Sequence, residues 1–270
     1  GPLGSHMNIN RQLPVSGSER LLTPDVGVSR QACSERHYST GQDRHDFYRF
    51  AARLHVDAQC FGLSIDDLMD KFSDKHFRAE HPEYRDVYPE ECSAIYMHTA
   101  QDYSSHLVRG EIGTPLYREV NNYLRLQHEN SGREAEIDNH DEKLSPHIKM
   151  LSSALNRLMD VAAFRGTVYR GIRGDLDTIA RLYHLFDTGG RYVEPAFMST
   201  TRIKDSAQVF EPGTPNNIAF QISLKRGADI SGSSQAPSEE EIMLPMMSEF
   251  VIEHASALSE GKHLFVLSQI

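Results

Sequence analysis

The spacing of apolar residues changes near Gly166, and this change limits the folds that the chain can adopt. From Asp43 to Phe61, Phe47, Phe50 and Leu54 recur at spacings of three and four residues, the pattern of one face of an amphipathic helix. Similar spacing, a serine N-cap at Ser64 or an N-terminal proline predicts further helices over 64–72, 115–127 and 146–164. The polar stretch 128–143 between the last two is predicted to be a loop.

After Gly166 the apolar runs are short, rich in β-branched and aromatic residues, and separated by Gly, Pro and Ser. The runs predicted to be strands cover 167–171, 191–199, 217–224, 241–245, 249–254 and 263–270. Helices first and strands later, without βαβ alternation, predict an α+β architecture. We therefore expect a single domain over 43–270, mostly helical over 43–165 and mostly β over 166–270.

The residues before this domain have a different composition. Residues 1–6 have the sequence of an expression-tag remnant before Met7, so they are excluded from the fold prediction. Residues 7–42 are rich in Ser, Arg, Gln, Pro and Gly and carry mostly isolated apolar residues, which predicts a flexible leader. No charged start leads into an apolar segment, so an ordinary secretory signal is not expected.

Charge and cysteine content exclude several classes of protein. The 28 Lys and Arg residues against 38 Asp and Glu give a net charge of −10, which argues against direct nucleic-acid binding. No apolar run approaches the length of a membrane span. The three cysteines form no CxxC pair, so neither a disulfide framework nor a metal site is expected.

Three segments of the β-rich half carry chemically useful side chains: 168–171 (VYRG), 197–201 (FMSTT) and 238–245 (SEEEIMLP). On a strand, Glu239 and Glu241 would project to one face, while Ile242 and Leu244 project to the other. A pair of carboxylates suits reactions with an oxocarbenium-like transition state. An isolated acidic run is more often a solvated turn, so the other two segments decide the interpretation.

The other two segments are ambiguous when taken alone. Arg170, which is followed by Gly171, could bind a phosphate bidentately, although such an arginine is more often part of a surface ion pair. The hydroxyls of Ser199, Thr200 and Thr201 could orient a neighbouring carboxylate, although such a run is more often a strand end or a helix cap.

In this order the three segments resemble the Arg-Ser-Glu class of mono-ADP-ribosyltransferases, the clostridial-toxin-like and arginine-specific branch. The family pattern is an aromatic-Arg-Gly strand, a Ser-Thr-Ser strand and a Glu-x-Glu strand, and the resemblance covers about 144–270. Thr201 replaces the last serine of the middle motif but keeps a hydroxyl. The resemblance implies a helical part followed by a mixed or antiparallel two-sheet core around an NAD+ cleft.

The resemblance also implies roles for individual residues. Arg170 would bind an NAD+ phosphate, Gly171 the nicotinamide amide, and Ser199 would position Glu241. Glu241 would stabilise the oxocarbenium ion, and Glu239 would orient or deprotonate the acceptor. A guanidinium has a pKa above about 12, so a carboxylate at that position favours arginine as acceptor.

Further residues are assigned to the cofactor and to the acceptor. Thr200 and Phe210 are expected at NAD+, Phe210 by stacking on nicotinamide, although an ordinary core aromatic fits Phe210 equally well. The turn from Gly232 to Ser238, with Gln235 and Ser238, would contact the target protein, although its small polar residues also fit a plain connection. NAD+ is the only cofactor expected, as co-substrate and without a metal.

The leader and the family together suggest a setting. A polar start without a secretory signal resembles those of type III secretion effectors of plant-pathogenic bacteria, which implies secretion into the host cytoplasm. The charge of −10 favours a basic host protein with exposed arginines, for example a nucleic-acid-binding protein, as target. No membrane association is expected.

Other functions are compatible with parts of the sequence. An NAD glycohydrolase would use water in place of arginine, and a non-catalytic binding module would keep only the fold. A cysteine protease built on Cys92 and His98, or on Cys60 and His55, is a weaker alternative because proximity in sequence does not make a catalytic dyad.

Overall fold

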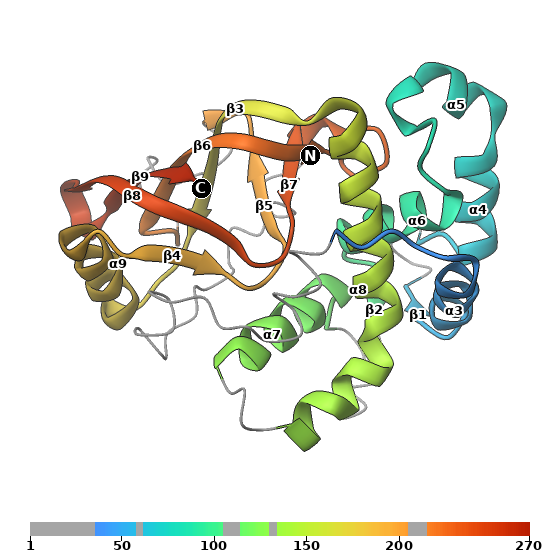
Figure 1. Cartoon of the computed structure of the whole chain (residues 1–270), viewed down its shortest axis with the longest axis horizontal. Coiled ribbons are helices and arrows are strands. Elements are labelled where there is room, and N and C mark those ends of the chain that lie inside the picture. The colour runs from blue at the N-terminus through green and yellow to red at the C-terminus, as the bar shows by residue number, and fades with distance from the viewer. Residues whose placement is uncertain (1–35, 58–61, 105–113, 130–133, 205–214) are drawn as a thin grey trace.

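The computed structural model describes residues 36–57, 62–104, 114–129, 134–204 and 215–270, and of 134–142 it describes the backbone only. Helices occupy the first half and strands the second, as Figure 1 shows. The helices α3 to α8, with the short 3₁₀ helix η3, span Gly41–Ala52 (α3), Ile65–Ser73 (α4), Lys75–Glu80 (α5), Pro82–Tyr84 (η3), Pro89–His98 (α6), Leu116–Glu129 (α7) and Glu134–Ala162 (α8). Two short strands, His55–Val56 (β1) and Tyr103–Ser104 (β2), pair antiparallel between them.

The second half begins where α8 ends. Its elements are Phe164–Ile172 (β3), Leu176–Thr188 (α9), Arg191–Glu194 (β4), Met198–Thr201 (β5), Ile218–Asp229 (β6), Pro237–Glu239 (η5), Glu241–Leu244 (β7), Ser248–Ala257 (β8), Ser259–Gly261 (η6) and His263–Gln269 (β9). The α+β prediction is confirmed, and each predicted strand run contains a strand. The run 191–199 covers two, because β4 ends at Glu194 and β5 begins at Met198.

The strands of the second half are hydrogen-bonded in the order β3-β5-β7-β6-β9-β8-β4, and an additional pairing joins β3 to β6. The long strand β6 takes part in several of these ladders. Residues 218–227 of β6 pair with β3, and 218–223 also pair with β9 in the only parallel ladder of the described sheet. Ala228 and Asp229, at the end of β6, pair antiparallel with β7. Because β5 joins β7 back to β3, the four strands β3, β5, β7 and β6 close on one another.

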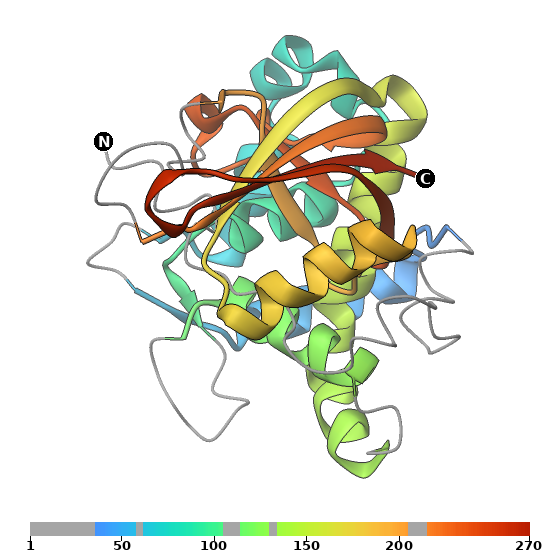
Figure 2. The same ribbon diagram turned by 90° about the vertical axis from the view of Figure 1, so that its left-hand side faces the viewer.

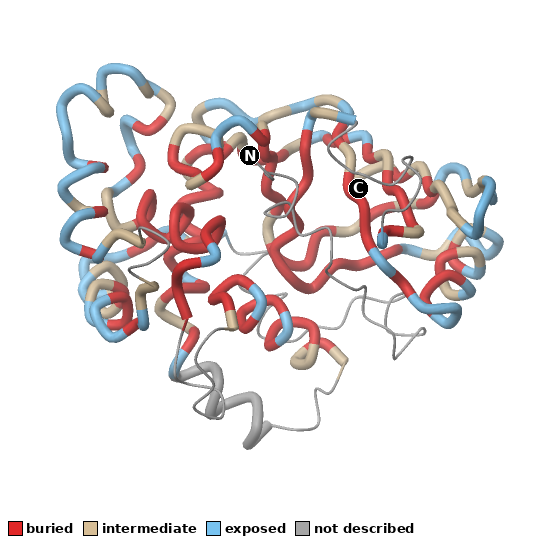
Figure 3. The backbone as a smooth tube through the Cα atoms, turned by 180° about the vertical axis from the view of Figure 1, so that it is seen from behind, coloured by how far each residue is buried: buried red, intermediate tan, exposed pale blue. Residues whose placement is uncertain are grey.

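The sheet separates two hydrophobic cores. One core lies between the helices of the first half and side chains such as Phe197, Ile230 and Met243. The other lies beneath α9, where Ile179, Leu182 and Leu185 contact the opposite side of the strands. Figure 1 shows α9 at the opposite end of the molecule from α3 to α6, and in Figure 2 it lies in front, alongside the strands. In Figure 3 the buried residues, drawn in red, gather along the central strands and the helices packed against them, and α6 is buried along most of its length.

Three sequence predictions need correction. The stretch 128–143, predicted to be a loop, contains the start of α8 at Glu134, and α8 continues through Pro146. Helix α9 was not predicted, although Asp175 caps its N-terminus and Gly189, with φ +68°, ends it. The first predicted helix, 43–61, is shorter than expected, because α3 ends at Ala52.

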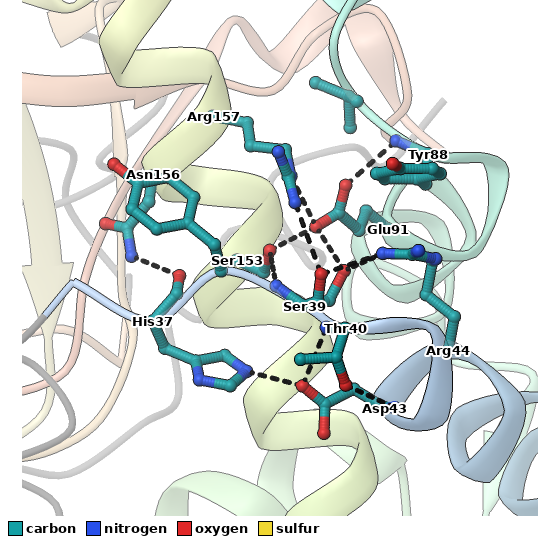
Figure 4. A network of polar contacts seen from close by, with 12 residues as sticks. His37, Ser39, Thr40, Asp43, Arg44, Tyr88, Glu91, Ser153, Asn156 and Arg157 are labelled. Atoms are coloured by element: carbon teal, nitrogen blue, oxygen red, sulfur yellow. Dashed lines mark hydrogen bonds and ion pairs between the residues drawn. The ribbon is translucent and has the colours of Figure 1, made fainter.

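The predicted leader, 7–42, reaches too far into the domain. Residues 36–40 contact α6 and α8, and α3 already begins at Gly41 with Thr40 as its capping residue. Ser39 is buried and hydrogen-bonded to Glu91 and Ser153, as Figure 4 shows. The end of this segment is therefore a fixed part of the folded domain. None of the helices in the described ranges is long and apolar enough to cross a membrane.

Candidate active site

The three motif segments come together because β5 lies between β3 and β7 (Figure 1). Tyr169, next to Arg170, pairs with Thr201 of β5. Thr201 in turn faces Glu241, the first residue of β7. Strand pairing therefore brings together three segments that are separated by about thirty to forty residues in sequence.

We call the place where β3, β5 and β7 bring the three segments together the strand junction. Arg170 is a buried cation at this junction, with 2% of its surface exposed. Its Nη1 donates a 2.9 Å hydrogen bond to the carbonyl oxygen of Ser199, while its buried Nε has no hydrogen-bond partner among the described residues. Burial lowers the pKa of Arg170 to about 10, an effect that the carboxylates of Glu194 and Glu241 oppose. Arg170 therefore stays charged at neutral pH and keeps a donor for an anionic ligand.

A buried ion pair that the sequence did not predict lies near Arg170. Arg125 of α7 donates through Nη2 to Glu194 Oε1 of β4 over 2.6 Å. Arg125 Nε, Glu194 Oε2 and the hydroxyl of Tyr192 are buried without hydrogen-bond partners among the described residues. Such orphaned polar atoms are rare in a folded protein and are expected where a polar ligand binds.

The hydroxyls of β5 fix the neighbouring backbone. Thr200 Oγ1 donates to the carbonyl of Ile242 over 2.7 Å, and Thr201 Oγ1 donates to the carbonyl of Glu239 over 2.8 Å. Thr200 was predicted to bind the cofactor, and in the structure its hydroxyl holds β7. Ser199 is buried on the same strand, between Arg170 and β7, and its proposed action on Glu241 stays a prediction.

Glu239 does not lie on a strand, contrary to the geometry expected for the Glu-x-Glu motif. It ends the 3₁₀ helix η5, Glu240 is left-handed with φ +47°, and β7 begins only at Glu241. Pro237 starts η5 and lacks an N–H for a ladder, which disfavours an extended strand here. The predicted alternation holds from Glu241 onward, because Ile242 and Leu244 enter the core beneath α9 while Met243 enters the other core.

Glu239 is nevertheless a buried carboxyl group, with 3% of its surface exposed. Neither of its carboxyl oxygens has a hydrogen-bond partner among the described residues. Burial, together with the negative charge of Glu241, raises the pKa of Glu239 to about 8. A buried carboxyl group with both oxygens available is suited to receive a ligand that donates hydrogen bonds.

The remaining predicted site residues fall into different surroundings. Gly171 lies in β3 and pairs with Ala219 of β6. Gln235 is half-buried and hydrogen-bonded to Asp102, whereas Ser238 is exposed on η5. Phe210 lies outside the described residues.

The alternative cysteine nucleophile has little structural support. Cys92 is fully buried in α6, and burial raises the pKa of its thiol well above the ordinary value, so the reactive thiolate is disfavoured. Cys60 lies outside the described residues. Among the described residues, no group of three or more His, Cys, Asp or Glu side chains is placed to hold a metal ion.

A hollow of about 790 Å³ lies elsewhere, against the helical half. Its lining includes Tyr38, Arg78, Tyr88 and Arg157, and it contains none of the predicted site residues. The strand junction, rather than this hollow, therefore carries the candidate chemistry.

Comparisons with known proteins identify the family of the chain. Residues 114–269 match the model of the ADP-ribosyltransferase exoenzyme family. A crystal structure of the ADP-ribosyltransferase HopU1 of Pseudomonas syringae pv. Tomato DC3000 is 98% identical in sequence and superposes with a TM-score of 0.80, covering 87% of this chain and 100% of that one.

Two more distant matches were found. The Vis protein of Vibrio splendidus, named as an NAD(+)–arginine ADP-ribosyltransferase, is 27% identical over 157 residues, which is 56% of this chain and 58% of Vis. The chain thus spans little more than half the length of that relative. The type III effector XopAI of Xanthomonas axonopodis pv. citri is 17% identical with a TM-score of 0.60, over 90% of this chain and 96% of its own, and shares the fold.

Proposed function

The chain belongs to the ADP-ribosyltransferase exoenzyme family, and we propose that it transfers the ADP-ribose of NAD+ to arginine side chains of a protein and releases nicotinamide. One observation carries the proposal: a buried arginine and two buried glutamates, Arg170, Glu239 and Glu241, meet at one strand junction. This reaction requires a cation that binds the diphosphate, one carboxylate at the reacting ribose and another at the acceptor.

The residues around Arg170 fit NAD+. The unpartnered Nε of Arg170 and the unpartnered Nε of Arg125 are buried donors suited to phosphate oxygens. The carboxylate of Glu194 pairs with Arg125 and also lies near Arg170. Its negative charge therefore partly balances the positive charges of both arginines before NAD+ binds. We assign diphosphate binding to Arg170 with Arg125 beside it, and nicotinamide contacts to the backbone of Gly171.

We assign Glu241 to the ribose. Its strand is held on one side by β5 and on the other by β6, so its position is set by two ladders. As nicotinamide leaves, positive charge develops on the ribose, and a carboxylate fixed nearby stabilises it without reorganising. In this proposal Ser199 orients Glu241.

Glu239 is assigned to the acceptor. An arginine guanidinium donates up to five hydrogen bonds and must lose a proton during attack on the ribose carbon. Both carboxyl oxygens of Glu239 lack hydrogen-bond partners among the described residues, and its pKa of about 8 is near the working pH, as general-base catalysis requires. An approaching guanidinium cation would lower this pKa and favour the carboxylate.

The experiment compares three glutamate variants of adjacent residues with labelled NAD+ and an arginine-rich acceptor. Glu241→Ala is expected to lose both transfer and nicotinamide release. Glu239→Gln is expected to lose transfer while keeping part of the nicotinamide release. Glu240→Gln is the matched control, because Glu240 points to Arg202 at the surface and forms a 2.6 Å ion pair there.

Each outcome of this experiment is decisive. Label that hydroxylamine removes under mild conditions identifies arginine as the modified residue. Nicotinamide release without any label on protein would instead indicate an NAD glycohydrolase, and the absence of both would indicate a binding module. Equal loss of both activities in Glu239→Gln would remove the acceptor role of that residue.

We also propose delivery into a host cell and a basic host protein as target. The polar composition of 7–42 and the net charge of −10 support this setting. A reporter fused to residues 7–42 should enter host cells only from bacteria with an intact type III apparatus. If transfer to basic proteins were insensitive to ionic strength, electrostatic attraction would not contribute to target choice.

A further inference from the structure

The loop that leads to Glu239 is held by the helical half of the domain. This loop, residues 230–236, connects the end of β6 with η5 and β7. Side chains from η3 and from the end of α6 contact it at three positions. These contacts join segments that are more than 130 residues apart in sequence, so the fold and not the local sequence creates them.

The strongest contact is made at Gln235. Its backbone N–H donates to Thr99 Oγ1 over 3.0 Å, and its side-chain Nε2 donates to Asp102 Oδ2 over 2.6 Å. Asp102 is 5% exposed, and hydrogen bonds to a carboxylate in such surroundings are stronger than those between neutral groups. Asp102 is itself fixed, because its carbonyl accepts from Asp57 N over 2.8 Å next to the β1–β2 pair.

A second contact is made by Tyr84. Its buried hydroxyl lies 2.7 Å from Ser233 Oγ. The ring of Tyr84 also packs against Gly232, where an added Cβ would come within 2.7 Å of ring atom Cε2. Only glycine permits this close approach of the loop backbone to the ring.

Two local hydrogen bonds then connect the part of the loop that the helical half contacts with Glu239. Ser234 Oγ accepts from Ala236 N over 3.0 Å, and the carbonyl of Ala236 accepts from Glu239 N over 3.1 Å. Pro237 between them has a fixed φ angle. The position of Gln235 therefore constrains the backbone of Glu239 from the loop side, while Thr201 holds its carbonyl from β5.

We propose that Asp102 and Tyr84 are positioning residues that set the place of the acceptor carboxylate Glu239 through Gln235 and Ser233. This inference rests on the proposed role of Glu239 in arginine transfer. It also gives Gln235 a different task from the predicted one, because its side chain is engaged by Asp102 instead of by the target protein. The helical half thus contributes to acceptor selectivity from behind the loop.

The test exchanges the donor and the acceptor of the Gln235–Asp102 hydrogen bond. Gln235→Glu places two carboxylates against each other and should lower the ratio of arginine transfer to NAD+ hydrolysis at least tenfold. Hydrolysis should fall less, because Glu241 is held by β5 and β6. Adding Asp102→Asn restores one donor and one acceptor, and should bring the ratio to within about threefold of the parent protein.

The matched control is Gln101→Glu, the same chemical change at the exposed neighbour of Asp102, and it should leave the ratio unchanged. Tyr84→Phe, which removes only the hydroxyl bonded to Ser233, should lower the ratio in the same direction by a smaller factor. It provides a second arm if Gln235→Glu does not fold. If the ratio of transfer to hydrolysis falls in Gln235→Glu and stays low when Asp102→Asn is added, Gln235 contacts the acceptor directly. That result would overturn the proposal.

Amide hydrogen exchange separates this inference from the proposed function. Exchange over residues 231–239 should become faster in Gln235→Glu and return to the parent rate in the double variant, whether or not the protein transfers ADP-ribose. Unchanged exchange in Gln235→Glu would show that Asp102 does not hold the loop. A parent protein with slow loop exchange and no transfer would contradict the proposed function alone.

Discussion

Glu239 and Glu241 lie two residues apart, yet they approach the site from different backbone conformations, a 3₁₀ helix and a β-strand, because Glu240 between them is left-handed with φ +47°. Glu241 is fixed by strand ladders, whereas Glu239 depends on the loop before it and on the hydroxyl of Thr201, which donates to its carbonyl. The two carboxyl groups are therefore supported separately. A change in the loop can alter the acceptor function while the group acting on NAD+ stays in place.

The first prediction concerns the pH dependence of transfer. Burial and the charge of Glu241 raise the pKa of Glu239 from 4.5 to about 8, so the free enzyme holds this carboxyl group largely protonated at pH 7. Only the ionised form can accept the proton of the arginine acceptor. We expect kcat/KM for the acceptor to rise with pH and to level off above about 8, and a profile that is flat between pH 6 and 9 would contradict the assignment.

The same shift predicts how stability depends on pH. Between pH 4.5 and about 8, the carboxyl group is ionised in the unfolded chain and protonated in the folded one, so unfolding releases a proton. Stability should therefore fall as the pH rises through this window. In Glu239→Gln this contribution is absent, so the free-energy advantage of the variant in urea unfolding should grow from pH 5 to pH 8 and then stay constant.

The second prediction concerns the residue between the two glutamates. Glycine adopts the left-handed conformation of Glu240 without strain, and the exposed ion pair with Arg202 contributes at most about 1 kcal/mol. Glu240→Gly should therefore change the free energy of unfolding by less than about 1 kcal/mol. Glu240→Val should cost about 1–3 kcal/mol, because a β-branched residue is strained at positive φ. Equal stability of the two variants in urea titrations would show that the left-handed turn is not required.

Sequence patterns predicted the strands of the site well but not the conformation at Glu239. Alternation from Glu241 to Leu244 follows from two cores on opposite sides of one strand, which is a local property of the sequence. That strand begins only at Glu241, and this depends on Thr201. Its hydroxyl donates a hydrogen bond to the carbonyl of Glu239, which lies 38 residues further along the chain. No pattern within the acidic run contains this information.

Two other features could not be predicted for similar reasons. The start of α8 is mostly charged, and Ile137 is the only large apolar residue of 134–143, so this sequence shows no apolar stripe and is typical of a loop. The Arg125–Glu194 pair joins a helix to a strand across 69 residues, and its members look like ordinary surface charges in the sequence. Helix α9 differs, because its N-terminal capping residue Asp175 and its C-terminal Gly189 are helix signals that the sequence itself contains.

The third prediction concerns the attachment of residues 36–40 to the domain, shown in Figure 4. Glu91 is fully buried and accepts from Ser39 Oγ, Ser153 Oγ and Arg157 Nε, the last over 3.0 Å. Glu91→Gln removes the charge that balances Arg157 and turns one acceptor into a donor facing other donors. We expect it to cost about 1–3 kcal/mol of unfolding free energy, measured by urea titration.

The control for this prediction is the neighbouring Glu90→Gln, since Glu90 is only partly buried. It should change stability by less than about 0.5 kcal/mol, as most surface substitutions do. The loss in Glu91→Gln should also be smaller when Arg157 is changed to Gln in the same chain, because the two side chains form one ion pair. Strict additivity of the two substitutions would show that this pair does not contribute to the attachment.

The last prediction concerns the buried arginine of the site. Lysine in place of Arg170 keeps a positive charge but loses the planar fork, so all its N–H donors sit on one nitrogen and cannot reach both the Ser199 carbonyl, which Nη1 contacts, and the separate place that Nε occupies. Arg170→Lys should lower kcat/KM for NAD+ at least tenfold, a loss of about 1.4 kcal/mol, mainly through a higher KM. Arg173→Lys makes the same change at an exposed position and should have no effect. A KM for NAD+ within twofold of the parent in Arg170→Lys would mean that charge alone suffices, and the unpartnered Nε of Arg170 would then have no part in binding.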